Sequence, residues 1–386
     1  HSRQVLSLIT LFTPCRMFLP GGRMSPTRKT TMKNRPSITK EEDHKNKEVP
    51  DICLRETAAH YHDELIRCIE QECGESGLYL PKISLGLWQN FGDQADYDEM
   101  KDIILTAFDM GVTHFDLANN YGPKPGAAEV NFGKIVRENL MPYRDELVIS
   151  TKAGYRMWDG PYGIGGSRKY LVSSLDQSLK RLGLDYVDIF YHHCMTPDTE
   201  LKETALALSD ITRQGKAIYV GMSNYNGKKM HRMYHRCDDL NVPFIINQNR
   251  YSIFDRTVEK NDLKKEAKSK KKGLIAFSPL AQGQLTDKLA GGIVENSRLY
   301  NNEVLQKKVG YSEGRQAQIA QLYKMAKDRG QTLSQLAIEW LLQWGEVTSV
   351  LIGVHSKTQL LENLKALECK PLSKSEIMQI NAIAGK

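Results

Sequence analysis

Four side chains in this sequence are of the types that together can transfer a proton to a substrate. They are Asp116, Tyr121, Lys152 and His193. A phenol donates a proton, an adjacent ammonium group lowers the pKa of that phenol, and a carboxylate keeps the ammonium group charged and oriented. A hydroxyl and an imidazole together hydrogen-bond an oxygen on which negative charge develops. The set therefore predicts a proton-transfer site with Tyr121 as the general acid.

These residues follow apolar runs that are typical of strands. Asp116 comes near the end of the run 113–118, and Tyr121 lies five residues on in an Asn-Asn-Tyr-Gly loop. Lys152 and His193 close the next two apolar runs. Successive parallel strands end on the same face of a sheet or barrel, so these side chains are expected to converge. Each alone would more often be a solvated surface residue, and only the set of four favours a site.

The elements that must position this site alternate along the chain. Near-continuous apolar runs, typical of parallel strands buried on both faces, alternate with amphipathic helices and predict an α/β (β/α)8 TIM barrel. The predicted strands are 83–88, 113–118, 147–152, 186–193, 217–224, 244–249, 273–279 and 349–354. The predicted helices are 97–110, 127–139, 168–182, 200–213, 226–240, 258–268, 313–328, 333–344, 357–366 and 373–384.

Three further segments stand out. A Gly-Glu-Ser-Gly turn at 74–77 predicts a small hairpin ahead of the barrel. The loops 154–167 and 282–312 both follow strands, so we expect them at the face where barrel active sites are built. The second is long enough to act as a lid.

The tetrad and its surroundings resemble the aldo-keto reductases, in which Asp, Tyr, Lys and His occur in this order. The segments 116–123 and 150–155 are most similar to the bacterial L-glyceraldehyde 3-phosphate reductases of that family, and more distantly to voltage-gated potassium channel beta subunits. The resemblance covers about Cys73 to the C-terminus. It implies a barrel over 49–386 with an N-terminal hairpin and extra C-terminal helices. Strand alternation turns only one of His192 and His193 inward. The resemblance to the family implies that this residue is His193.

The resemblance implies NADPH/NADP⁺ as the hydride carrier. A Gly-x-Gly-x-x-Gly motif after the first strand is absent, and the family binds its dinucleotide extended across the barrel mouth. The resemblance implies that Phe277 stacks on the nicotinamide ring. It also implies that Lys288 and Arg298 bind the adenosine-side phosphate and so favour NADPH over NADH. The implied cofactor-binding positions are Trp88, Gln94, Ser223, Asn224, Gln248, Phe277, Ser278, Leu280, Gln282, Gly283, Lys288, Arg298, Gly353, Gln359, Glu362 and Asn363.

Two tryptophans are predicted to line the substrate pocket, Trp88 and Trp158. The alternatives are that Trp88 belongs to the barrel core and that Trp158 only anchors its loop. No metal site is expected, since His231 and His235 lack the intervening Glu of a zinc-protease motif. A thiol nucleophile at Cys194 is a weaker alternative, because no other residue supports that chemistry.

Charge and composition set the N-terminal segment apart. Residues 1–40 contain eight of the 53 basic residues and no Asp or Glu, and the remaining 45 basic residues face 46 acidic ones. The folded part is thus nearly neutral, so no nucleic-acid partner is expected. Residues 1–48 are predicted to be a disordered basic tail. Its Arg-rich composition resembles a transit peptide, while Met24 or Met32 could instead be the true start.

Seven cysteines without paired spacing favour a reducing compartment, so a cytoplasmic location is predicted, with an organelle as the alternative if the tail is a targeting segment. No apolar run is long enough to insert into a membrane. The expected function is NADPH-dependent reduction of small aldehydes or ketones, such as L-glyceraldehyde 3-phosphate or methylglyoxal, in a possible homo-oligomer. The alternative is a regulatory NADPH-binding subunit of the channel-beta type with weak reductase activity.

Overall fold

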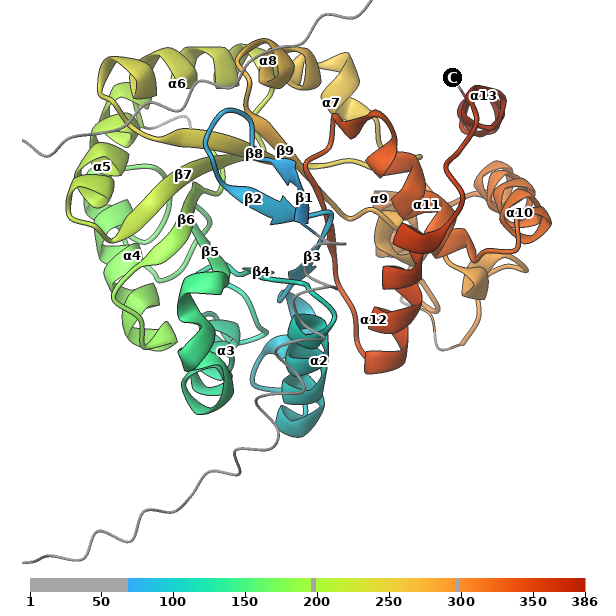
Figure 1. Cartoon of the computed structure of the whole chain (residues 1–386), viewed down its shortest axis with the longest axis horizontal. Coiled ribbons are helices and arrows are strands. Elements are labelled where there is room, and N and C mark those ends of the chain that lie inside the picture. Colours follow the sequence, from blue (N-terminus) through green and yellow to red (C-terminus); the bar gives the residue numbers. More distant parts are fainter. Residues whose placement is uncertain (1–68, 196–198, 296, 298, 386) are drawn as a thin grey trace, which may run out of the picture. The chain divides into compact units, whose positions relative to one another are not determined.

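Eight parallel strands form a closed barrel with helices around it (Figure 1). The computed structural model describes residues 69–195, 199–295, 297 and 299–385. The predicted tail at 1–48 lies outside these residues. The strands are hydrogen-bonded in the order β10-β3-β4-β5-β6-β7-β8-β9, which confirms the predicted (β/α)8 barrel. They are β3 (Ile83–Gly86), β4 (His114–Asp116), β5 (Val148–Ala153), β6 (Val187–His192), β7 (Ala217–Ser223), β8 (Phe244–Arg250), β9 (Gly273–Phe277) and β10 (Ser349–Ile352).

The barrel interior is filled by side chains. Every residue of β5 and β6 is buried, as the continuous apolar runs predict for strands that are covered on both faces. The ring of Tyr191 on β6 occupies the space beside Gly221 on β7, where a Cβ atom would approach that ring to 2.3 Å. Because the interior is packed rather than hollow, a small molecule can reach the strand residues only at an end of the barrel.

A hairpin lies across the amino-terminal end of the barrel, as the Gly-Glu-Ser-Gly turn predicts. It consists of β1 (Ile69–Glu72) and β2 (Tyr79–Pro81), and it crosses the barrel in Figure 1. Leu80 of the hairpin is fully buried in a cluster with Val148, the first residue of β5. The hairpin therefore covers the end at which the strands begin, and the opposite end carries the loops that follow the strands.

The predicted helices are present, and two of them, α4 (Arg168–Leu182) and α10 (Glu313–Asp328), have the predicted bounds. The segment α4 begins after the N-cap Ser167, whose side chain accepts a hydrogen bond from the Tyr170 N–H, and ends at Gly183 with φ of 68°. The others are α2 (Tyr97–Asp109), α3 (Ala127–Ile135), α5 (Leu201–Arg213), α6 (Gly227–Asp239), α7 (Thr257–Lys260), α8 (Leu263–Ser269), α9 (Glu303–Lys308), α11 (Leu333–Leu342), α12 (Lys357–Leu364) and α13 (Lys374–Ile383).

Two helix predictions are wrong in detail. The predicted helix at 258–268 is two helices, α7 and α8, because Asp262 has a left-handed φ of 61°. Asn261 holds this break, since its side-chain oxygen accepts from the Leu263 N–H and its carbonyl accepts from the Gly227 N–H of α6. The predicted helix at 127–139 ends as α3 at Ile135 and continues as a short π-helix.

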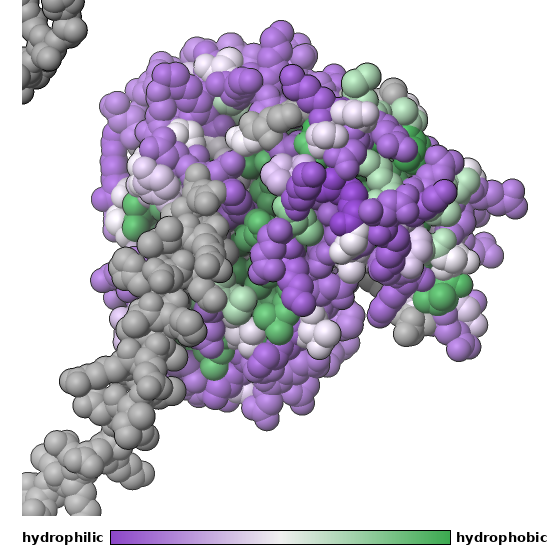
Figure 2. All heavy atoms as spheres, turned by 45° about the vertical axis from the view of Figure 1, so that its right-hand side comes forward, coloured by the Kyte–Doolittle hydropathy of each residue, from purple (hydrophilic) through white to green (hydrophobic). Residues whose placement is uncertain are grey.

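The predicted loop at 282–312 contains the short helix α9 and two single turns of 3₁₀ helix near its start. In the view of Figure 2 the surface is mainly hydrophilic, with smaller apolar patches among the polar residues. Of the helices that the structure describes, none has the length and apolar character needed to cross a membrane.

Candidate active site

The four predicted catalytic side chains lie together at the carboxyl end of the barrel. Asp116 ends β4 and pairs in register with Ser150 of β5, two residues before Lys152. The Lys152 ammonium group forms an ion pair with the Asp116 carboxylate and donates to the Leu117 carbonyl at 2.7 Å. It also lies 3.4 Å from the Tyr121 hydroxyl. Burial lowers the pKa of Lys152 and the carboxylate of Asp116 opposes that fall, so Asp116 helps to keep the ammonium group charged.

His193 completes the cluster from the end of β6. Its ring meets the Tyr121 ring edge-on, with 5.9 Å between centroids. Burial lowers the pKa of His193 well below its ordinary range, and the charge of Lys152 lowers it further, so the imidazole is neutral at neutral pH. The neighbouring His192 points the other way and hydrogen-bonds the Tyr225 hydroxyl through Nδ1 at 2.7 Å. Strand alternation thus places His193, and not His192, beside Tyr121.

The sequence predicts that the Lys152 charge lowers the pKa of the Tyr121 phenol, and this prediction is wrong. Burial raises the pKa of this phenol well above its ordinary range, and the carboxylate of Asp116 and the neighbouring phenol of Tyr155 raise it further. Lys152 does not reverse this, because its charge is paired with Asp116 and its hydrogen bonds go mainly to Asp116 and Leu117. The hydroxyl therefore carries its proton at neutral pH, which is the state that an acid needs before it donates.

A chain of buried hydrogen bonds that sequence analysis missed supports Asp116 from below. The Ser150 hydroxyl donates to Asp116 Oδ1 at 2.6 Å, so it accepts from His114 Nε2 at 3.0 Å. Burial lowers the pKa of His114 to about 4, so this ring is neutral and its Nδ1 accepts from Ser84 at 2.8 Å. Ser84 in turn accepts from Ser349 at 2.6 Å. Each hydrogen bond thereby has one direction, set by the carboxylate at its end.

The loop 154–167 is held over the site by residues that sequence analysis also missed. Tyr155 is 41% exposed and its ring meets the His193 ring edge-on at 4.6 Å. The Tyr170 hydroxyl of α4 donates to the Tyr155 carbonyl and accepts from Asn119 Nδ2 at 3.1 Å. The Trp158 ring packs on Tyr170 at 5.3 Å. Trp158 therefore anchors the loop, and Tyr155 is the aromatic residue of this loop that lies against the tetrad.

The predicted cofactor positions fall into three groups, of which the first lies near the carboxyl ends of β7, β8 and β9 and in the segment that follows β3. Trp88 is 48% exposed, with its ring centroid 6.5 Å from that of Tyr121, and Gln94 lies exposed in a turn before α2. Ser223 and Asn224 end β7, and the Asn224 amide donates to the His193 carbonyl at 3.0 Å. The other two members lie on the next two strands, β8 and β9. Gln248 donates through Nε2 to Asp116 Oδ1 at 3.0 Å, and Phe277 ends β9.

The second group is the loop after β9. Its backbone takes left-handed conformations at Ser278, Gln282 and Gly283, with φ of 55°, 61° and 91°, and Gln282 donates to the Ser278 hydroxyl at 3.0 Å. Leu280 is half-buried within this turn. Lys288 is exposed a few residues on. Arg298 lies outside the described residues.

The third group lies at β10 and α12 and carries an observation that fits a bound ligand. Gly353 follows β10, Gln359 accepts from the His355 N–H at 3.0 Å, and the Glu362 carbonyl accepts from Gln335. Asn363 is 1% exposed, and neither its Nδ2 nor its Oδ1 has a hydrogen-bond partner among the described residues. A buried amide seldom lacks both partners, so this side chain fits a group that hydrogen-bonds it from outside the chain.

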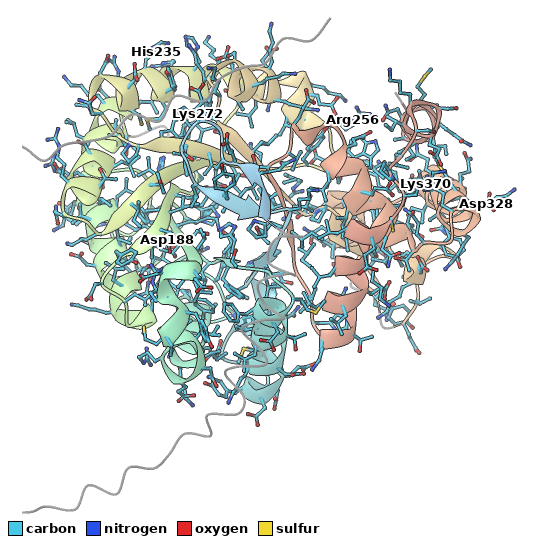
Figure 3. All side chains as sticks on the ribbon, viewed as in Figure 1. Asp188, His235, Arg256, Lys272, Asp328 and Lys370 are labelled. Atoms are coloured by element: carbon cyan, nitrogen blue, oxygen red, sulfur yellow. The ribbon has the colours of Figure 1, made fainter. Side chains whose placement is uncertain are left out.

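Two other places in the structure, a cavity beside α7, α8 and α11 and the thiol of Cys194, are weaker candidates for an active site than the tetrad. The cavity, of about 390 Å³, lies between these helices, where Arg256 is placed in Figure 3. Two of its cations already have carboxylate partners, Arg256 with Glu259 at 2.7 Å and Lys264 with Glu346 at 2.6 Å. Burial raises the pKa of Cys194 to about 11, which disfavours a thiolate. The described residues contain no group of His, Cys, Asp and Glu that could hold a metal ion.

A closed (β/α)8 barrel with this tetrad at its carboxyl end defines an oxidoreductase of carbonyl groups. Residues 82–384 match the model of the aldo/keto reductase family. The chain belongs to that family.

Individual relatives agree with this assignment. The L-glyceraldehyde 3-phosphate reductases of Escherichia coli O157:H7 and K12 are each 49% identical over 313 residues, which is 80% of this chain and 90% of theirs. A probable voltage-gated potassium channel subunit beta of Arabidopsis thaliana is 34% identical over 78% of this chain and 91% of its own. A solved thermostable aldo-keto reductase in complex with the inhibitor epalrestat matches with a TM-score of 0.64 and 28% identity, over 81% of this chain and 98% of that chain.

Proposed function

We propose that this protein reduces small aldehydes or ketones to alcohols with NADPH, and that Tyr121 is the general acid. The observation that carries the proposal is the Lys152 ammonium group 3.4 Å from the Tyr121 hydroxyl and paired with Asp116. L-Glyceraldehyde 3-phosphate is the first candidate substrate, because the relatives that are 49% identical carry that name. Methylglyoxal and similar short carbonyls are the next candidates.

The proposed chemistry uses each tetrad side chain in a separate role. NADPH, when bound, supplies the hydride that adds to the carbonyl carbon. Neutral His193 and the protonated Tyr121 hydroxyl hold the carbonyl oxygen by hydrogen bonds, which strengthen as negative charge develops on that oxygen. The Tyr121 proton then passes to the oxygen, and Lys152 stabilises the phenolate that remains. Asp116 keeps Lys152 charged and aimed at the phenol.

The residues present fit a nicotinamide dinucleotide phosphate along the barrel mouth. Phe277 would stack on the nicotinamide, and Ser223, Asn224 and Gln248 lie at the neighbouring strand ends. The loop 278–283 would hold the pyrophosphate through peptide groups, and the unpartnered amide of Asn363 would hold the adenine. Lys288, with Arg298, would contact the additional phosphate and favour NADPH over NADH.

The four cysteines that the structure describes are free, which supports a reducing cytoplasm as the location.

The test compares the wild type with Tyr121→Phe in NADPH oxidation, followed by absorbance, with L-glyceraldehyde 3-phosphate and with methylglyoxal. Loss of the acid is expected to lower kcat by about 100-fold or more, while NADPH still quenches the tryptophan fluorescence. Tyr162→Phe is the matched control, since Tyr162 is an exposed tyrosine of the loop after β5 and should retain full activity.

Other results would point elsewhere. Tight NADPH binding with negligible turnover of any short carbonyl would favour a regulatory subunit like the channel beta relatives. Failure of the wild type to bind NADPH would contradict the cofactor assignment. Equal turnover by Tyr121→Phe and the wild type would remove Tyr121 from the role of acid.

A further inference from the structure

Arg250 places a positive charge at the barrel mouth that the proposed chemistry does not use. It is the last residue of β8, its side chain is exposed, and it forms no ion pair or hydrogen bond with any residue that the structure describes. Most other exposed arginines that the structure describes have a hydrogen-bond or ion-pair partner. Arg156, for example, sits on the loop after β5 and pairs with Asp159 at 3.4 Å.

The register of β8 turns Arg250 toward the mouth. Alternate residues of a strand face the same side, and Gln248 faces inward, where it donates to Asp116. Asn249 faces the helices, since its amide donates to the Tyr225 carbonyl at 2.9 Å. Arg250 is therefore the next inward residue, about 7 Å above Gln248 along the strand. Its register partner on β9 is Phe277, and its guanidinium lies 5.9 Å from that ring.

The charge of Arg250 is not balanced by the tetrad. Lys152 and Asp116 neutralise each other, and His193 is neutral at neutral pH. The positive charge of Arg250 also acts on Tyr155. Burial raises the pKa of the Tyr155 phenol, and the charge of Arg250 offsets part of that rise. Tyr155 lies against His193 at 4.6 Å between ring centroids. A ligand whose carbonyl sits between Tyr121 and His193 would thus share the barrel mouth with an unpaired guanidinium.

We propose that Arg250 binds the phosphate group of a short phosphorylated carbonyl substrate and so determines the preference for that substrate class. A guanidinium matches two phosphate oxygens with parallel N–H groups, and the interaction is strong when no carboxylate competes for it. Arg250 would orient the substrate rather than take part in proton transfer. This inference rests on the proposed function, because it assigns the second anchor point of the same substrate.

The test measures a ratio, kcat/KM for L-glyceraldehyde 3-phosphate divided by kcat/KM for unphosphorylated glyceraldehyde. Arg250→Gln is expected to lower that ratio about tenfold or more, and Arg250→Lys is expected to recover part of it, because a point charge is retained without the planar fork. Arg156→Gln is the matched control and should leave the ratio at the wild-type value. The Kd of NADPH is measured for each variant by fluorescence.

A second measurement needs no turnover. Glycerol 3-phosphate is the alcohol that reduction of glyceraldehyde 3-phosphate gives, and calorimetry on the NADP⁺-loaded protein reports its Kd. Arg250→Gln should weaken this binding about tenfold with the NADPH Kd unchanged. An unchanged ratio and an unchanged glycerol 3-phosphate Kd would overturn the inference, and so would a weakened NADPH Kd with an unchanged ratio, which would make Arg250 a cofactor residue. If the wild type reduced no carbonyl but bound glycerol 3-phosphate through Arg250, the proposed function alone would fail.

Discussion

At the scale of single residues, the position of the Asp116 carboxylate is set by three side chains from two other strands. Ser150 of β5 and Gln248 of β8 donate to its Oδ1, and Lys152 pairs with its Oδ2. Ser150 also accepts from His114, so its hydroxyl connects the tetrad to the buried chain of hydrogen bonds below. Asp116 is therefore held in one orientation, and Lys152 is held with it.

Ser150→Ala is expected to reduce both stability and activity. The substitution removes one donor from Asp116 and leaves His114 Nε2–H buried without an acceptor, at a cost of about 1–3 kcal/mol in the free energy of unfolding. A looser Asp116–Lys152 pair should lower kcat several-fold while the NADPH Kd stays the same. Urea unfolding and steady-state kinetics measure the two effects.

Ser349→Ala is the control at the far end of the same hydrogen-bonded chain. It removes the bond from Ser349 to Ser84 and leaves the bonds to His114, Ser150 and Asp116 intact. Stability should fall by about 1 kcal/mol with kcat unchanged. If Ser150→Ala lost stability but kept the wild-type kcat, the orientation of Asp116 by Ser150 would be irrelevant to catalysis.

At the scale of elements, a buried ion pair joins α3 and α4 to β5, directly beside the tetrad. Glu129 of α3 is fully buried, accepts from Thr151 Oγ1 at 2.6 Å, and pairs with Arg181 Nε of α4 at 2.7 Å. The two helices also pack closely at Gly133, where a Cβ atom would approach the Leu182 carbonyl oxygen to 2.4 Å. The pair therefore sets how α3 and α4 sit on the strand that carries Lys152.

Arg181→Met is expected to destabilise the protein by about 3 kcal/mol. Removing one partner of a buried pair leaves Glu129 as an uncompensated buried charge, which costs more than the pair itself contributes. Chemical denaturation measures the free energy of unfolding. The double substitution Glu129→Gln with Arg181→Met removes that charge and should recover part of the loss.

Lys216→Met is the matched control for an ion pair on the surface. Lys216 pairs with Asp176 at 2.7 Å, but both side chains are substantially exposed, so solvent screens the pair. Its loss should change stability by less than about 1 kcal/mol. Equal losses in the two single variants would contradict the special role of burial at Glu129.

At the scale of the whole molecule, the barrel encloses several neutral histidines. Burial lowers the pKa of both His114 and His192 to about 4, and it lowers the pKa of His193 as well. In the unfolded chain these groups bind protons at their ordinary pKa near 6.5. Between about pH 6.5 and 4 the unfolded chain thus binds more protons than the folded protein, so stability falls as the pH drops through this window, and the part due to His114 and His192 levels off below about pH 4.

His192→Asn should make stability less dependent on pH between 6.5 and 4. Removing one such histidine removes about one bound proton from the unfolded state, and the slope of the unfolding free energy should fall by up to about 1.4 kcal/mol per pH unit. Urea unfolding at pH 7.5, 6 and 5 measures this slope. The control is His235→Asn, since His235 lies exposed on α6 (Figure 3). A slope that changes equally in both variants would argue against burial as the cause.

Local pattern was enough to predict the strands, most helices and the face that carries the site. The bounds of α4 and α10 match their prediction, because caps and apolar periodicity are properties of neighbouring residues. The choice of His193 over His192 follows from the alternation of side chains along a strand combined with the family resemblance. These features depend on residues within a few positions of one another.

Features that depend on contacts between distant segments became visible only in the folded chain. The break at Asn261 is held by Gly227, and the hydrogen bonds under Asp116 join Ser84, His114, Ser150 and Ser349 from four strands. The direction of the Tyr121 pKa depends on burial and on which charge Lys152 already balances. Whether Arg250 has a partner depends on what packs around the mouth. Burial and pairing are properties of the three-dimensional surroundings, which residue type and spacing along the chain do not specify.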